Sequence, residues 1–555
     1  MSKALTVYTG SFIDDIFYVL LIKEQYRLIQ SLYGKHYCNL KSLSTKELKD
    51  FIIELEKISE KSYELKIVYD SFYEMNCYGG KVFYDYYEDI NKICKTLQLE
   101  ITYFTEDKFK TLLNDYELTN YKSFLYSKEI LKKDIMSIDI DIIIQKKRET
   151  NLVFLKKMYN TCIQDIIYIK ENNFPNDYII ELTHRNQRFT INTFNINIFT
   201  HIVNDVIKNR KIDCNVLNRN NDFDYFLESN QIPLEIFSSL FSSIIDKSSI
   251  CKDYFEFKAI KKDVSMLTSN DFFDPLYDKS EGKVSFQFAI TTVKRVFGKI
   301  NRDFEDIIDL LIEKNRIQLT YCGESYCIEG TKKVLPKVFV NFDDELQSIF
   351  ILMHELGHAV SSYYSNNNTF FNTSVYLFGS ESFAVFSEII LYNELKHCSV
   401  RHSEYFIEYL LNYVFTNSVL FDWEYSLLQE EIDDCLSANS ISNLWQSSYM
   451  KFFSEAVAFL PEERMGWIFN SSIIDNSYIG FKKCFDIMLS LAFFYLYSND
   501  PLIFKNKIVD FLSKGKSVTL IELLEIIGIQ KDDESIWINS LEVIEKFVEL
   551  YKFQS

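Results

Sequence analysis

Glycine and proline are scarce in this chain, with 14 glycines and 6 prolines in 555 residues. These two residue types build most of the tight turns that a protein of many short strands needs. Hydrophobic residues make up 47 % of the chain, and its length allows two or more packed lobes around sizeable cores. The composition therefore predicts a mostly helical protein.

Local patterns agree with that prediction. Ser44 and Glu47 have the spacing of a capping box at a helix start, and so do Thr519 and Glu522 near the end of the chain, where Gly528 is the expected stop. Apolar residues after the first box recur on one helical face at Leu48, Phe51, Ile52, Leu55 and Ile58. Both segments are predicted to be amphipathic helices.

The polar stretch NNFPNDY, residues 172–178, is a plausible break between lobes. It predicts an N-terminal helical domain over residues 1–185 and a second domain over residues 186–555. The second domain holds the motifs discussed next.

The net charge of −19 argues against nucleic acid and against an anionic membrane surface as partners. The first residues lack the pattern of a secretory signal, and the apolar run at 487–497 is too short to span a bilayer. These features predict a soluble cytoplasmic protein.

One strand and one long helix can be predicted side by side. Residues 337–342, KVFVNF, are β-branched and aromatic, and Pro336 before them suits an edge strand. A helix is expected to follow at once, with Asp343 and Asp344 at its acidic start. Its core-facing side chains are predicted to be Ile349, Phe350, Met353 and Val360.

That helix carries the motif H-E-x-x-H as His354, Glu355 and His358. Residues four apart lie on one face of a helix, so both imidazoles can bind one metal ion while Glu355 acts as a base toward a water molecule. By the chain's own His and Glu frequencies, the motif arises by accident in on the order of one such chain in a hundred. The motif predicts a zinc-dependent hydrolase.

A catalytic zinc needs a third protein ligand. A metzincin would have a third histidine six residues after His358, but Tyr364 stands there. Glu381 and Glu388, two helical turns apart on one face, are the better candidates. We predict one zinc ion per chain with Glu381 as the third ligand and Glu388 holding a ligand imidazole in place. The alternative is that both glutamates simply lie on an exposed helix surface.

Together these motifs resemble the thimet oligopeptidase-type zinc metallopeptidase family, in particular its oligoendopeptidase F branch. The resemblance rests on H-E-L-G-H, on the E-x6-E repeat from Glu381, and on SYC within residues 323–327. It extends weakly over most of the chain and is specific at the metal motif.

The resemblance implies a mostly helical clam or bowl with zinc deep in a channel, and a small edge sheet beside the active-site helix. It implies that residues 186–555 form the catalytic metallopeptidase domain. The strand at 337–342 would pair with substrate backbone. The expected activity is hydrolysis of internal bonds in short unstructured peptides, by water activated by zinc and Glu355.

Two departures from the family pattern bear on activity. Ser361 replaces a histidine, and in the turn NSYIGF, residues 476–481, Tyr478 is kept while Phe481 replaces a tyrosine. Tyr478 is therefore predicted to be the remaining hydroxyl that stabilises the oxyanion. The departures leave two alternatives: a non-catalytic or very slow peptide-binding protein of the same fold, or a dedicated maturation peptidase for one peptide. The intact Glu355 argues against a pure binder.

Overall fold

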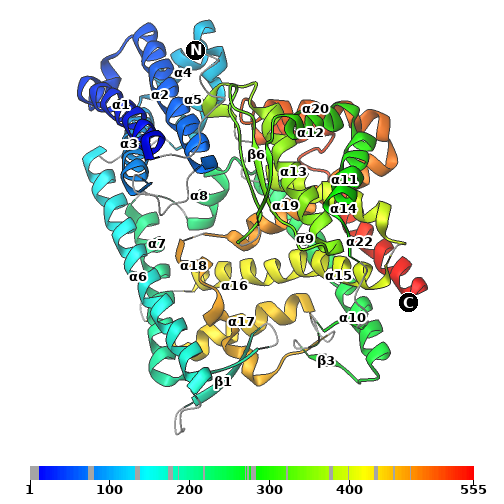
Figure 1. Ribbon diagram of the computed structural model, residues 1–555. Coiled ribbons are helices and arrows are strands. Elements are labelled where there is room, and N and C mark those ends of the chain that lie inside the picture. Colours follow the sequence, from blue (N-terminus) through cyan, green and yellow to red (C-terminus); the bar gives the residue numbers. More distant parts are fainter. Residues whose placement is uncertain are drawn as a thin grey trace.

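The computed structural model confirms the mostly helical prediction, since long helices follow one another along the chain and the strands are few and short (Figure 1). It describes residues 12–72, 80–131, 138–172, 179–184, 187–216, 219, 221–268, 271, 274–276, 283–320, 323–373, 379–397, 399–430, 435–453, 457–475 and 477–555. The predicted break between lobes at 172–178 lies outside these ranges except for Asn172.

The first helices pack around a hydrophobic core of their own. The α2 residues predicted to share an apolar face are all buried in it. The capping box at the start of α2 is also present, because the Glu47 N–H donates to Ser44 Oγ (3.3 Å) and the Ser44 N–H donates to the Glu47 carboxylate (2.9 Å). The elements are α1 (Phe12–His36), η1 (Leu40–Ser42), α2 (Thr45–Phe72), α3 (Gly80–Ile101), α4 (Glu106–Leu113), η2 (Tyr116–Tyr121) and α5 (Lys122–Ile130).

A second, larger core extends from Leu155 to Tyr551. The two cores divide between Leu125 and Leu155, earlier than the domain boundary predicted at residue 185, which lies outside the described residues. The division into domains at that residue stays a prediction. The elements that open this part are α6 (Ile138–Asn172), β1 (Ile179–His184), β2 (Gln187–Asn192), α7 (Thr193–Val216), α8 (Asp222–Ser229), α9 (Leu234–Asp246), α10 (Ser249–Lys262), β3 (Leu267–Thr268), α11 (Phe286–Ile300) and α12 (Arg302–Glu313).

A three-stranded sheet contains the predicted strand, but not at its edge. The strands β4 (Ile317–Thr320), β5 (Tyr326–Ile328) and β6 (Lys337–Asn341) have the order β4–β6–β5. The prediction of an edge strand at 337–342 is wrong, because β6 pairs with β4 in parallel and with β5 antiparallel. The ladder begins at Lys337, so Pro336, which has no N–H, precedes the first paired residue and costs no ladder hydrogen bond. A substrate strand therefore cannot pair with β6.

The predicted long helix is α13 (Leu346–Ser365), and it begins three residues later than expected. Asp343 stands just ahead of it and accepts a hydrogen bond from the Glu345 N–H (3.1 Å). The four residues predicted to face the core are buried. β5 and β6 contact α13 on one side, and α14 (Gly379–Leu395) packs along another.

The chain ends in a series of helices that close the larger core. The second predicted capping box, Thr519 with Glu522, is present, and Gly528 ends that helix with a left-handed φ of 102°. The elements are η4 (Phe370–Asn372), α15 (Val400–Leu411), η5 (Asn412–Thr416), α16 (Asn417–Gln429), α17 (Ala438–Phe453), β7 (Val457–Ala458), η6 (Pro461–Phe469), α18 (Ser472–Asp475), α19 (Ile479–Asn499), α20 (Pro501–Lys514), α21 (Leu520–Ile527) and α22 (Glu534–Gln554).

Within the described ranges, no helix combines the length and the apolar character needed to cross a bilayer. The bowl shape and deep channel implied by the family resemblance stay predictions.

Candidate metal centre

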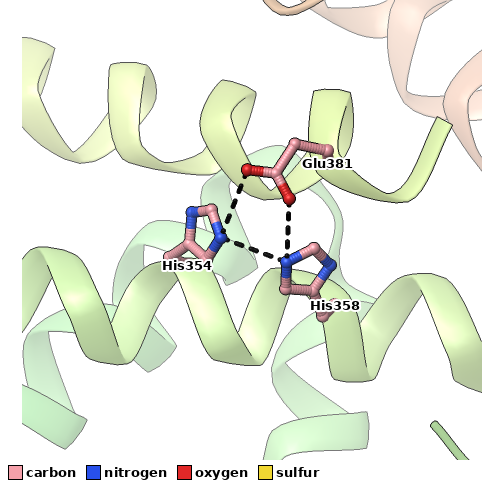
Figure 2. A group of neighbouring side chains, drawn as sticks. All are labelled: His354, His358 and Glu381. Atoms are coloured by element: carbon pink, nitrogen blue, oxygen red, sulfur yellow. Dashed lines mark hydrogen bonds and ion pairs between the residues drawn. The ribbon is translucent and has the colours of Figure 1, made fainter. Parts of the chain in front are cut away.

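Three side chains from two adjacent helices converge on one point (Figure 2). α13 presents the imidazoles of His354 and His358 one turn apart, with 3.1 Å between their Nε2 atoms. Glu381, in the first turn of α14, reaches toward both, with its carboxylate oxygens 3.6 Å from His354 Nε2 and 3.4 Å from His358 Nε2. One donor atom from each residue lies within 4.8 Å of the others.

The outward nitrogen of each imidazole is held by a residue of α14. His354 Nδ1 lies 2.6 Å from Glu388 Oε1, and His358 Nδ1 lies 2.8 Å from Ser380 Oγ. These contacts orient both rings and leave both Nε2 atoms facing the shared point. Glu388 stands where the sequence predicted a supporting carboxylate. Ser380 was not foreseen, and its position directly before Glu381 is the only signal in the sequence.

The charges of the cluster reinforce one another. Burial alone would raise the pKa of Glu381, but the hydrogen bond from His358 and the charges of His354 and Lys483 outweigh it and lower this pKa. Burial would likewise lower the pKa of His354, yet the contact with Glu388 raises it to about 9. The lowered pKa of Glu381 favours its ionised form, which can balance the charge of a cation.

Glu355 lies beside the three converging groups and is 8 % exposed. Burial raises the pKa of its carboxyl group, and the nearby charges of His354 and His358 offset only part of that effect. A carboxylate with a raised pKa is a stronger proton acceptor. Its place and its basicity suit a general base.

The donor set fits a catalytic zinc site. Two imidazole nitrogens and one carboxylate oxygen are a common three-ligand set for such sites, which keep a further position for water or substrate. Within the part of the chain that the structure describes, this is the only group of three His, Cys, Asp or Glu residues arranged to hold a metal ion.

Tyr478 lies in different surroundings. Its side chain is fully buried, its ring packs against Phe223 and Phe226, and the Arg210 guanidinium lies 4.6 Å from the ring centroid. Phe481 is fully buried in the same aromatic cluster. No described contact joins Tyr478 to His354, His358 or Glu381, so the structure does not bring this predicted residue to the site, and its role stays a prediction.

Two tyrosines that the sequence analysis passed over interact electrostatically with the carboxylates of the centre. Tyr409 lies in the last turn of α15, and Tyr413 follows in η5. The negative charges of Glu388 and Glu381 act on both, raising the pKa of each phenol beyond what burial does. Aromatic residues four apart in a helix normally indicate a core face, so their spacing does not point to a position beside a metal centre.

A helical fold with an H-E-x-x-H motif and a carboxylate as the candidate third metal ligand is typical of metallopeptidases. Comparisons with known proteins indicate which metallopeptidases this chain resembles. Residues 292–543 match the family model "Peptidase family M3". The oligoendopeptidase F homologue of Borreliella burgdorferi is 21 % identical over 389 residues, which are 64 % of this chain and 64 % of that protein. Oligopeptidase PepF of Bacillus subtilis is 20 % identical over 321 residues, covering 55 % of this chain and 47 % of that protein. Residues 292–543 are thus similar to peptidase family M3, and the two relatives above are an oligoendopeptidase F homologue and an oligopeptidase.

Solved structures support the fold. A protein of Chlamydophila abortus superposes with a TM-score of 0.80 at 16 % identity, covering 92 % of this chain and 91 % of that one. Oligoendopeptidase-F from Enterococcus faecium superposes with a TM-score of 0.63 at 13 % identity, covering 96 % of this chain and 97 % of that one. The chain spans less than two thirds of the length of the two curated relatives above, so what they do extends to it only as a proposal.

Proposed function

We propose that this protein is a zinc-dependent endopeptidase that hydrolyses internal bonds of short, unstructured oligopeptides. The observation that carries the proposal is the convergence of His354, His358 and Glu381 beside the buried carboxylate of Glu355. That arrangement matches the requirement for hydrolysis of an amide by an activated water molecule.

Each residue has a distinct part in this proposal. Zinc, when bound by the two imidazoles and Glu381, supplies a Lewis acid that polarises water and the scissile carbonyl. Glu355 accepts the proton of the attacking water and delivers it to the leaving amine. Glu388 and Ser380 keep the imidazoles oriented through their Nδ1 atoms.

The proposed substrates are peptides of roughly five to twenty residues, a range taken from the enclosed channel of the family rather than from any residue here. A folded protein cannot present an extended segment to an enclosed site. Short peptides should therefore be cut and folded proteins left intact.

The rival candidate is a peptide-binding protein of the same fold with little or no turnover. Ser361 favours it, because this residue is fully buried and its hydroxyl makes no hydrogen bond among the described residues, so it cannot replace a histidine that contacts substrate. Phe481, without a hydroxyl, favours it too. A third candidate, a maturation peptidase dedicated to one peptide, shares the same chemistry.

Incubation with a mixed library of short peptides, followed by mass spectrometry, tests these candidates. The endopeptidase predicts internal cleavage of many peptides that stops on addition of a chelator and returns with zinc. Cleavage of one peptide family alone would favour the maturation enzyme. Binding without any cleavage would overturn the proposed activity. Native albumin, added in parallel, should stay intact.

A further inference from the structure

α15 runs antiparallel to α14 and leads toward the metal centre. Ser403 Oγ, near the start of α15, donates to the Lys396 carbonyl just past the end of α14 (3.1 Å). One turn along α15, Phe406 stacks on Tyr392, one turn back along α14, with 4.4 Å between ring centroids. Residue numbers along α15 therefore increase in the direction in which residue numbers along α14 decrease.

This register places two tyrosines beside the site. One turn back from Tyr392 on α14 is Glu388, and one turn beyond Phe406 on α15 is Tyr409. A further turn brings Tyr413 level with the first turns of α14, where Glu381 lies. The electrostatics agree, since Glu388 is the carboxylate acting most strongly on Tyr409 and Glu381 is the one acting most strongly on Tyr413.

Tyr413 sits in a π-helical turn, η5, between α15 and α16. Such turns are rare and occur often at functional sites. Here the turn is fixed by α19, because Cys484 Sγ donates to the Val414 carbonyl (3.3 Å). Ser418 Oγ donates to the same carbonyl (2.8 Å). The extra residue of a π turn changes which way the following side chains point, and the packing of α19 locks that choice.

Both phenols are available to a ligand. Tyr409 and Tyr413 are half-buried, their rings meet edge to face with centroids 5.6 Å apart, and within the described ranges neither hydroxyl has a hydrogen-bond partner. Tyr478 differs, since it is fully buried beneath Arg210. Of these three tyrosines, Tyr413 in η5 and Tyr409 in α15 are thus the ones whose hydroxyls are free to meet a substrate near Glu381.

We infer that the Tyr413 hydroxyl, with Tyr409 packed behind it, is the donor that binds the substrate carbonyl oxygen as water attack makes it negative. The inference rests on the proposed function, since only hydrolysis creates that oxyanion. Burial and the charges of Glu381 and Asp486 raise the pKa of Tyr413. The phenol therefore stays protonated and able to donate over the working pH range.

The test compares Tyr413→Phe with wild type and with Tyr405→Phe. Tyr405 lies two turns earlier, is exposed, and its hydroxyl accepts a hydrogen bond from the Gln347 side chain (3.4 Å). Tyr413→Phe is expected to lower kcat about a hundred- to a thousandfold with KM changed by less than about threefold, because the bond forms mainly in the transition state. Bound zinc and melting temperature should match wild type, and Tyr405→Phe should behave as wild type.

A second readout does not depend on turnover. A phosphinic peptide carries a tetrahedral anionic group that mimics the oxyanion. Its affinity, measured by calorimetry on the zinc-loaded protein, should fall about a hundredfold or more in Tyr413→Phe, while affinity for the matching product peptide stays constant.

The outcomes separate the inference from the proposed function. If wild type cuts no peptide, the proposed function fails, and phosphinate binding still decides whether Tyr413 contacts a tetrahedral anion. Unchanged phosphinate affinity in Tyr413→Phe overturns the inference. So does a loss of kcat in Tyr478→Phe that Tyr413→Phe does not show, because the donor would then be Tyr478.

Discussion

Gly357 of α13 lies so close to Ala384 of α14 that a Cβ atom added to the glycine would stand 2.8 Å from the Ala384 Cα atom. Only a residue without a side chain allows this approach. It matters for function, because His354 and His358 flank Gly357 on one helix while Glu381 and Glu388 flank Ala384 on the other. The contact sets the distance between the two halves of the candidate metal centre.

Gly357→Ala should therefore weaken both the fold and the site. Overpacking against a backbone atom forces the two helices apart and costs about 1 to 3 kcal/mol. Replacing a glycine inside a helix by alanine gains only about 1 kcal/mol, so the net effect is destabilising. We expect a lower melting temperature and weaker zinc binding. Gly34→Ala on α1 is the matched control, since nothing lies within 4 Å of its added Cβ, and it should leave zinc binding unchanged and the melting temperature equal to or slightly above that of wild type. A Gly357→Ala protein as stable as wild type would mean that the two helices separate at no cost.

Glu381→Ala should abolish stoichiometric zinc binding, since it removes one of the three proposed protein ligands. Wild type should carry one zinc ion per chain by metal analysis after dialysis. Glu394→Gln is a suitable control, because this residue of α14 pairs with Lys299 and Arg295 away from the site. Full zinc retention by Glu381→Ala would exclude Glu381 as a ligand.

Glu355→Gln should keep zinc and fold but lose cleavage. The amide preserves the shape of the side chain and removes the base that we propose takes the proton of the attacking water. Turnover of a fluorogenic peptide is expected to fall to background while metal content and melting temperature stay at wild-type values. Wild-type turnover in a zinc-loaded Glu355→Gln protein would assign the base to another group.

Glu388→Gln should weaken metal binding without removing a ligand. The carboxylate lies 2.6 Å from His354 Nδ1 and orients that imidazole. Loss of such a supporting group typically raises the dissociation constant of the metal about ten- to a hundredfold. Competition with a calibrated chelator measures this shift, and an unchanged constant would reduce Glu388 to a packing role.

His402 should make the protein sensitive to acid. It is 5 % exposed, its Nε2 has no hydrogen-bond partner among the described residues, and burial lowers its pKa to about 4 from the ordinary 6.5. The folded state therefore binds fewer protons than the unfolded state as pH falls from 6.5 to 4. The contribution of the neutral His402 ring to the free energy of unfolding is complete above pH 6.5. At pH 4 this contribution is smaller by about 3 kcal/mol.

The His402→Phe protein lacks this titration. Its melting temperature should therefore fall less than that of wild type between pH 7.5 and pH 4.5. Acid effects at the metal centre are common to both proteins and cancel in the comparison. His201→Gln, at an exposed position of α7, should follow wild type. Equal losses in His402→Phe and wild type would show that the buried ring carries no acid sensitivity.

The sequence alone predicted features whose cause is local. Capping boxes at Ser44 and Thr519, the stop at Gly528, the strand from Lys337 and the helix through His354 all follow from residue spacing within one element. H-E-x-x-H belongs to this group, because an i, i+4 pair shares a face in any α-helix.

Features that depend on distant segments were decided by the tertiary structure. β6 is a central strand because β4 and β5, only four and three residues long, pair on its two sides, and such short strands carry little signal of their own. Tyr478 occupies a position that matches the family motif in the sequence, yet packing against Phe223 and Arg210 buries its side chain. The register of α15 on α14 and the π turn fixed by Cys484 bring Tyr413 toward Glu381 instead. Helix periodicity can be predicted from one segment, whereas the surroundings of a side chain depend on which segments pack against it.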